Sequence, residues 1–211
     1  TTDPAALDGP YGFGATHHGV ADPAALAGLG EDWLFEGVSH KFHACCHGLH
    51  AALEALAGAD IAGPEVAQIA VATHLRWLSV CNQPAPTTGL GAKFSYRTAL
   101  ALRVAGHDTA ALSTWSDALA TAPQITALRD RISVAGDESL GELHARLTLT
   151  RKDGAQIEAF HDLDAPMPLA DRAARVTAKA RALIGQPLAD EAAALLQGDA
   201  PVSRFTALFI R

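Results

Sequence analysis

The clearest signal for β-structure lies in residues 143–161, which read LHARLTLTRKDGAQIEAFH. Over residues 143–150, apolar and polar side chains alternate with the period of two that is typical of a half-buried strand. An Asp-Gly pair at 153–154 is a hairpin turn signal, and residues 155–161 are predicted to form the return strand. Residues 143–161 are therefore predicted to form an antiparallel hairpin.

The segments on either side of this hairpin are mostly helical. A further strand is predicted over residues 66–73, where side chains alternate between two faces, and a short strand over 33–38. Residues 74–81 fit either a strand or a helix, and the Pro- and Gly-rich residues 81–91 fit a loop. Helices are predicted over residues 23–29, 44–57, 95–104, 116–120, 123–130, 168–184, 187–196 and 202–209. This order of elements predicts an α+β fold with a helical tail.

The composition argues against several classes of protein. The chain has 211 residues, of which 49% are hydrophobic and 18% charged, so a sizeable core is expected. The net charge is −7 and no Lys/Arg-rich run occurs, which argues against a nucleic-acid partner. No apolar stretch approaches the roughly 18 residues of a membrane span, so no membrane partner is expected. Cys45, Cys46 and Cys81 do not make a disulfide framework, and a cytoplasmic location is the simple expectation.

The densest group of chemically reactive side chains lies in residues 41–50, KFHACCHGLH. Four polar residues share one face of the predicted helix, at i, i+4, i+7 and i+11: His43, His47, His50 and Glu54. Cys46 lies beside His50 at the edge of this face, and Lys41 lies where the chain enters the helix. The face thus combines three imidazoles, a thiol, a carboxylate and an amine.

Three interpretations of this face stay open. Two histidines four residues apart can share a zinc ion with a third ligand, although the chain has no HExxH or CxxC pattern. Alternatively, Lys41 carries a proton in acid–base catalysis while the histidines orient a carboxylate or move protons. The third interpretation is a polar helix face against solvent or another domain, with Lys41 an ordinary solvated lysine.

A second group of polar residues occupies residues 81–97, CNQPAPTTGLGAKFSYR. Free backbone N–H groups of a Gly-rich loop, the dipole of the following helix and the cations Lys93 and Arg97 suit a carboxylate or a phosphate. Ser95 lies between these cations at the helix start, but the stretch is neither a GxSxG elbow nor a GxxxxGK[ST] phosphate loop. An ordinary capped helix with solvent-facing basic residues is the alternative interpretation.

The two groups form a pair of motifs. Lys41, Cys46 and His50 make the pattern Lys-x-x-x-x-Cys-x-x-x-His, and residues 86–95 read Pro-x-Thr-Gly-Leu-x-Ala-Lys-Phe-Ser. This pair resembles the hallmark motifs of the MmgE/PrpD family. The resemblance covers about residues 9–185, because the intervening strand, the Arg-Ile-Ser-Val segment and the hairpin also follow the family's order.

The resemblance implies a class of reaction and roles for individual residues. The family includes 2-methylcitrate dehydratase, cis-aconitate decarboxylase and iminodisuccinate epimerase, which move a proton beside a carboxylate without a metal or organic cofactor. Lys41 matches the family's lid lysine, a candidate acid–base group, and His50 matches the motif histidine. Cys46 occupies the position of a catalytic histidine in the decarboxylase, which argues against decarboxylation, and Ala44 stands where many members have proline.

The expected site follows from these matches. The expected catalytic residues are Lys41, His50 and Cys46. The residues expected to bind substrate are His43, His47, Lys93, Ser95 and Arg97. Neither a metal nor a cofactor is expected. The favoured activity is dehydration of a small di- or tricarboxylate by acid–base proton transfer, as in 2-methylcitrate dehydratase. The alternatives are an isomerase resembling iminodisuccinate epimerase and a non-catalytic module that binds a carboxylate or another subunit.

The resemblance also implies a division into domains, with the active site between a large helical domain and a small lid. Residues 36–165 are expected to form the α+β lid domain of helices and a β-sheet. Residues 1–35 and 166–211 are expected to be flanking segments of an all-α domain that is mostly absent from this chain. The expected partners are therefore a small carboxylic acid, the missing N-terminal helical half or a separate partner chain, and a second copy in a homodimer.

Overall fold

The computed structural model of the chain describes residues 6, 9–17, 22–33, 37–59, 61 and 65–210. The chain divides into two compact units, Thr1–Ser39 and His40–Arg211. The second unit contains both motifs and the sheet, and it is the unit that carries the candidate site.

In the first unit the structure describes two short helical elements. They are α1 (Phe13–Thr16) and the 3₁₀ helix η1 (Pro23–Leu26). The carboxylate of Asp22 caps this 3₁₀ helix by accepting a hydrogen bond from the amide of Ala24 (2.9 Å), and the helix is shorter than the one predicted over 23–29. The strand predicted over 33–38 includes residues 34–36, which lie outside the described residues.

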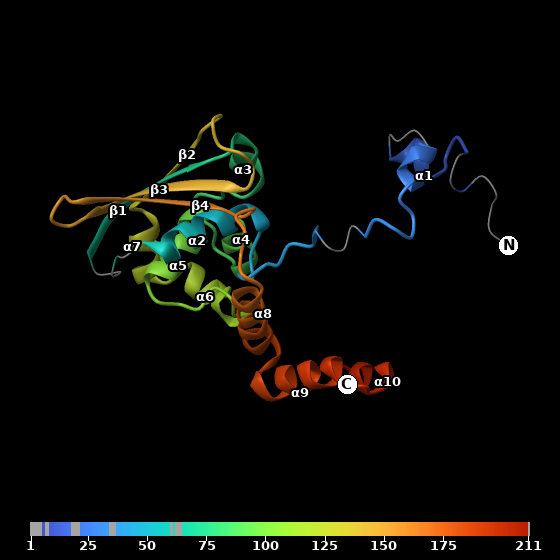
Figure 1. Ribbon diagram of the computed structural model, residues 1–211. Helices are drawn as coiled ribbons and strands as arrows, with labels where there is room; N and C mark the ends of the chain where they lie inside the picture. Colours follow the sequence, from blue (N-terminus) through green and yellow to red (C-terminus); the bar gives the residue numbers. More distant parts are fainter. Residues whose placement is uncertain are drawn as a thin grey trace. The chain divides into compact units, whose positions relative to one another are not determined.

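A four-stranded mixed sheet organises the second unit (Figure 1). Its strands are β1 (Val66–Thr73), β2 (Ile132–Gly136), β3 (His144–Arg151) and β4 (Gln156–Asp162), in the order β2-β1-β3-β4. β1 pairs in parallel with β2, with Ile69 opposite Ile132, and antiparallel with β3. β3 and β4 form the predicted hairpin, which turns at Gly154 with a φ of 88°, a conformation that glycine adopts readily. The α+β prediction is confirmed.

Helices cover one face of this sheet. α2 (His50–Gly58) packs against β3 and β4, and α5 (Tyr96–Val104) packs against α2 and β2. The shorter helices are α3 (Leu75–Val80), α4 (Gly89–Ala92), η5 (Leu112–Thr114), α6 (Asp117–Ala120) and α7 (Pro123–Arg129). Figure 1 shows α2, α5, α6 and α7 on the same side of the sheet. Ile69, Val71 and Thr73 of β1 are buried on this side, whereas the residues between them are more exposed, as in a two-layer α/β arrangement.

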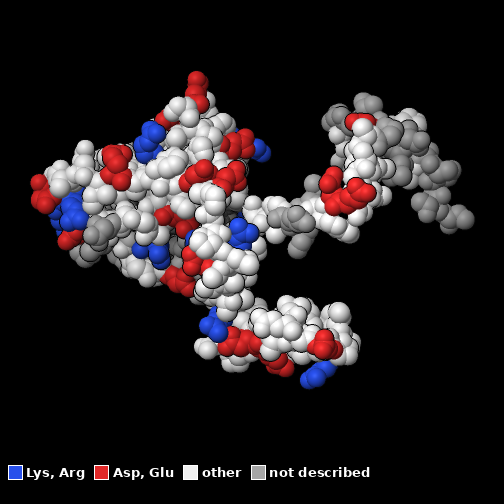
Figure 2. Space-filling model, in the orientation of Figure 1, with Lys and Arg blue, Asp and Glu red and all other residues white. Residues whose placement is uncertain are grey.

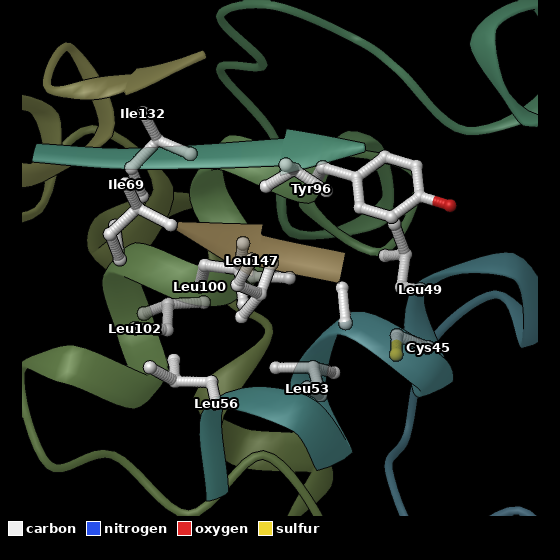
Figure 3. Close-up of a cluster of buried hydrophobic side chains, with 14 of the residues drawn as sticks. Cys45, Leu49, Leu53, Leu56, Ile69, Tyr96, Leu100, Leu102, Ile132 and Leu147 are labelled. Atoms are coloured by element: carbon white, nitrogen blue, oxygen red, sulfur yellow. The ribbon is translucent and has the colours of Figure 1, made fainter. Parts of the chain in front are cut away.

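The hydrophobic core lies between α2, α5 and the sheet (Figure 3). Leu49, Leu53 and Leu56 are buried, as the helical spacing predicts, and they share one cluster with Leu100 of α5 and Leu147 of β3. Full burial of one leucine side chain contributes about 1.5–3 kcal/mol to folding. This cluster therefore holds α2, and the motif that precedes it, against the sheet.

The predicted C-terminal helices are confirmed as α8 (Leu169–Ile184), α9 (Gln186–Gln197) and α10 (Val202–Ala207). α8 ends at Gly185, whose φ is 83°, and α9 begins immediately after it. Large apolar side chains remain exposed along this segment at Leu169, Leu183, Ile184, Leu196, Val202, Phe209 and Ile210. Within the described parts of the chain, no helix is both long enough and apolar enough to cross a membrane.

The helix predicted over 44–57 is wrong at its N-terminal end. α2 begins only at His50, after the 3₁₀ turn η3 (His47–Leu49), and Cys46 has an extended ψ of 142°. The amides of Ala44 and Cys46 donate to the carbonyl oxygens of Thr109 (2.8 Å) and Lys93 (3.0 Å) instead of entering a helix. Tertiary hydrogen bonds therefore override the helical propensity of this segment.

Two further segments have a structure that the sequence did not specify. Residues 74–81, which fitted either structure, form α3, and the Nδ1 of His74 accepts a hydrogen bond from the amide of Arg76 at its start (3.2 Å). β2 was not predicted as a strand, because its five residues are too few to establish a period. Its partner β1 lies far away in the sequence, so only the tertiary structure brings the two strands together.

Candidate functional site

Two hydrogen bonds join the two sequence motifs. The amide of Cys46 donates to the carbonyl oxygen of Lys93 (3.0 Å), and the hydroxyl of Tyr96 donates to the carbonyl oxygen of Gly48 (2.6 Å). Tyr96 is fully buried, and its oxygen also lies 2.9 Å from the hydroxyl oxygen of Thr73 on β1. The loop of the first motif is therefore held against the start of α5.

Gly48 makes this close approach possible. A Cβ atom at this position would lie 2.6 Å from the indole ring of Trp77 and 2.8 Å from the Sγ of Cys81. Both distances are shorter than van der Waals contact, so a side chain here would displace α3 or the first motif. The glycine thus sets how closely the histidine-rich loop packs on the rest of the unit.

His50 is a buried, neutral imidazole. Burial is the largest influence on it, and together with His43, His47 and Lys41 it lowers the pKa of His50 to about 3. The ring centroids of His43 and His47 lie 5.1 and 5.7 Å from that of His50. Among the described residues, the Nε2 of His50 has no hydrogen-bond partner. Burial, and then Lys41, also lowers the pKa of the half-buried His47.

His43 belongs to a buried network that reaches α8. Its Nδ1 lies 2.7 Å from the hydroxyl oxygen of Thr109, and its Nε2 lies 3.1 Å from the Oε1 of Glu54. The guanidinium of Arg175 donates to the same carboxylate oxygen and lies 3.9 Å above the ring of Phe42. Burial alone would raise the pKa of Glu54, but the hydrogen bonds from His43 and Arg175 outweigh it and lower this pKa to about 2. Both ring nitrogens of His43 are therefore engaged with protein groups.

The cysteines differ in exposure. Cys45 and Cys81 are buried, as small apolar side chains are, whereas Cys46 is half-buried. Burial, followed by the neighbouring Cys46, raises the pKa of Cys45 to about 12 and that of Cys81 to about 12. Both buried thiols are thus protonated at neutral pH, and they are poor candidates for nucleophiles.

Three lysines act electrostatically on residues of the first motif or on one another. Lys41 is exposed, and its charge influences Cys45, His47 and His50. Lys179 of α8 also influences Cys45, and the half-buried Lys93 influences Lys179. The two lysines of the sequence motifs therefore share an electrostatic neighbourhood with a third that sequence analysis did not select.

Ser95 and Arg97 have unequal access to a ligand. Ser95 is fully buried, and its hydroxyl oxygen accepts from the amide of Thr98 (3.2 Å) and lies 3.1 Å from the Thr98 hydroxyl. This is the predicted N-cap of α5. Arg97 is half-buried, and its Nε has no hydrogen-bond partner within the described part of the chain.

Comparison with known families gives this arrangement a context. The family model of the MmgE/PrpD C-terminal domain matches residues 43–200. The chain belongs to the MmgE/PrpD family. No curated protein sequence matches the chain. The match includes the sheet, α2, both His50 and Cys46, and the whole second motif, while Lys41 lies two residues before it. The MmgE/PrpD family is one of lyases and dehydratases.

This MmgE/PrpD domain contains a cavity of about 320 Å³ beside the first motif. Phe42 and His43 line it next to the motif. Its charged lining residues are Arg103, Asp108, Arg175 and Lys179. None of these four was selected from the sequence. Arg175 and Lys179 are spaced i, i+4 on the predicted helix 168–184, and this spacing was a signal that could have identified them as a pair.

Metal-ligand geometry is not found around the histidines. Among residues 37–59, 61 and 65–210, no three or more His, Cys, Asp and Glu side chains are grouped so that they could hold a metal ion. The helix face that suggested zinc does not form as predicted, because His43 and His47 precede α2. The arrangement in this MmgE/PrpD domain suits hydrogen bonding and charge stabilisation by amines and imidazoles.

Proposed function

We propose that this chain carries the lid half of an acid–base site that dehydrates a small di- or tricarboxylate without a cofactor. The observation that supports this most is the Cys46–Lys93 hydrogen bond, which holds the two family motifs together in an MmgE/PrpD domain. Lys41 acts electrostatically on His47 and His50, and Lys93 acts on Lys179, so the region around the first motif contains several amines. Such a region suits a substrate with more than one carboxylate.

The proposed chemistry is a β-elimination. A base removes a proton from the carbon next to a carboxylate, the electron pair of that C–H bond forms the C=C bond, and the C–O bond breaks. We assign Lys41 as the acid that protonates the departing hydroxyl, which leaves as water. The base is expected from the helical half of the enzyme. The positive charge of Lys93 stabilises the negative charge that develops on the carboxylate.

His50 and Cys46 have supporting roles in this proposal. The low pKa of about 3 keeps His50 neutral, so this buried side chain does not store a proton and instead positions His47, whose ring centroid lies 5.7 Å from its own. Cys46 is half-buried in the same loop and its amide holds Lys93. His47, Lys93 and Arg97 are proposed to bind carboxylate groups, because each is only partly buried and cationic or able to become so.

Two alternatives have specific support. An epimerase would use the same proton transfer beside a carboxylate but would return the proton to the same carbon, without a leaving group. A non-catalytic module that binds a carboxylate or a subunit is supported by the exposed apolar side chains of α8–α10, such as Leu169, Leu196 and Val202. In either enzyme proposal, these helices are expected to pack on the all-α domain of the family.

The decisive experiment is an activity assay of the chain together with the helical half, using 2-methylcitrate, cis-aconitate and iminodisuccinate. Lys41→Ala is expected to lower kcat by about 100-fold or more, the usual contribution of a general acid or base. Lys152→Ala removes an exposed lysine of the hairpin turn and is the matched control. Undiminished kcat in Lys41→Ala would refute the assigned role of this lysine.

A further inference from the structure

The cavity beside the first motif has an excess of positive charge. Arg103, Arg175 and Lys179 line it against one carboxylate, that of Asp108. The whole chain has a net charge of −7, so this local excess runs against the overall balance. On the face drawn in Figure 2, basic side chains lie scattered among acidic ones, which makes a lined cavity with three cations distinctive. Local charge of this kind concentrates anions.

Two of the three cations have hydrogen-bond donors that the protein does not use. The ammonium of Lys179 donates to the carbonyl oxygen of Ala110 (2.9 Å), which leaves its other two N–H groups for a ligand. The exposed side chain of Arg103 on α5 makes no hydrogen bond or ion pair with the described residues. Arg175 differs from both, since it is paired with Glu54 and stacked on Phe42. Arg103 and Lys179 are thus the groups that can capture an anion.

The rest of the lining limits what the anion can be. A volume of about 320 Å³ lies at the lower end of the range for small-molecule pockets, so a small acid fits and a nucleotide does not. Phe42 and Ala178 give the cavity an apolar wall that suits a methylene chain. The carboxylate of Asp108 lowers the affinity for an anion, but three cationic side chains line the same cavity. Its Oδ1 accepts a hydrogen bond from the amide of Ala110 (2.9 Å).

We propose that this cavity is an anion subsite in which Arg103 and Lys179 bind one carboxylate group of a di- or tricarboxylate. The subsite lies beside the first motif, because Phe42 and His43 line it directly after Lys41 in the chain. The subsite rests on the proposed function in one respect, because that function identifies the ligand as a polycarboxylate. It deepens that proposal by assigning a place to the carboxylate that does not react.

The test is calorimetric titration of the full chain at neutral pH and low ionic strength, with tricarballylate, acetate and inorganic phosphate as probes. Tricarballylate is expected to bind, and acetate to bind at least tenfold more weakly. Arg103→Gln and Lys179→Gln are each expected to weaken tricarballylate binding about tenfold, which corresponds to loss of one charge-assisted hydrogen bond. Arg204→Gln and Lys152→Gln remove exposed cations outside the cavity and are expected to change binding less than twofold.

Several outcomes would overturn the subsite. They are tricarballylate binding unchanged in both cavity variants, an equal loss in the Arg204 and Lys152 controls, and phosphate binding as tight as tricarballylate. The circular dichroism spectrum of each variant should match that of the unmodified chain, which excludes misfolding as the cause of lost binding. If Lys41→Ala abolishes turnover while the cavity variants bind normally, the subsite is wrong and the proposed function stands. If the cavity variants lose binding while Lys41→Ala retains turnover, the subsite stands and the role of Lys41 is wrong.

Discussion

The amide of Cys46 donates a 3.0 Å hydrogen bond to the carbonyl oxygen of Lys93, and this contact joins the two motifs of an MmgE/PrpD domain. The ψ of 142° at Cys46 is extended rather than helical, so the chain leaves the helical conformation where this contact forms. Together with the hydrogen bond from the Tyr96 hydroxyl to the Gly48 carbonyl, this contact holds the irregular loop beside the start of α5. The proposed chemistry depends on this juxtaposition.

Gly48 is predicted to be intolerant of any side chain. Gly48→Ala would set a methyl group 2.6 Å from the Trp77 ring and 2.8 Å from the Cys81 sulfur, so we expect a loss of about 1–3 kcal/mol in the free energy of unfolding. Urea denaturation measures the change. Gly58→Ala, at the end of α2 with no atom within 4 Å of the added methyl, is the matched control and should be neutral or stabilising. Equal effects of the two substitutions would show that the close packing at Gly48 is unimportant.

His50 is predicted to make the protein less stable in mild acid. Its pKa is about 3 in the folded chain against an ordinary value of 6.5, so between these values the unfolded chain binds a proton that the folded chain does not. Stability is therefore full above about pH 6.5 and falls as the pH is lowered toward 3, with a loss of about 2 kcal/mol by about pH 5. Urea denaturation across this window should show a clearly flatter pH dependence for His50→Gln. The exposed His40→Gln control should keep the original slope.

The Arg175–Glu54 pair is predicted to fix α8 to α2. Glu54 is nearly buried, so Arg175→Met would leave its carboxylate with His43 alone and should destabilise the chain by about 2 kcal/mol or more. The double variant Arg175→Met/Glu54→Gln should recover part of this loss, because the uncompensated charge is removed. Arg181→Met breaks the exposed pair with Asp190 on the same helix and should change stability by less than about 1 kcal/mol. Thermal denaturation of the four proteins distinguishes these expectations.

Ser95 is predicted to act through the helix rather than through the ligand. Ser95→Ala removes the cap of α5 and should cost about 1 kcal/mol of stability. Its hydroxyl is fully buried, so the affinity for tricarballylate should change less than twofold at a temperature where the variant stays folded. A tenfold loss of affinity without loss of stability would instead assign Ser95 to ligand binding. Ser116→Ala, the cap of α6, is the comparison for a cap outside the motifs.

Local sequence alone determined a large part of this fold. The β3–β4 hairpin follows from period-two alternation and the turn at Gly154, α5 follows from its Ser95 cap, and α8 follows from its amphipathic pattern. These elements were predictable because their stabilising groups lie within a few residues of one another. The two motifs and their resemblance to the MmgE/PrpD family could likewise be identified from the sequence. The family match confirms that resemblance.

Only the tertiary structure decided which of these elements meet. The parallel pairing of β1 with β2, the Cys46–Lys93 hydrogen bond and the cavity that Arg103 and Lys179 share all join residues far apart in the sequence. The periodicity of the sequence does not reveal such contacts, because they depend on how the buried leucines of α2 position the loop that precedes this helix. For the same reason the helix predicted over 44–57 was too long, because long-range hydrogen bonds from the amides of Ala44 and Cys46 hold this segment in a non-helical conformation despite its helical propensity.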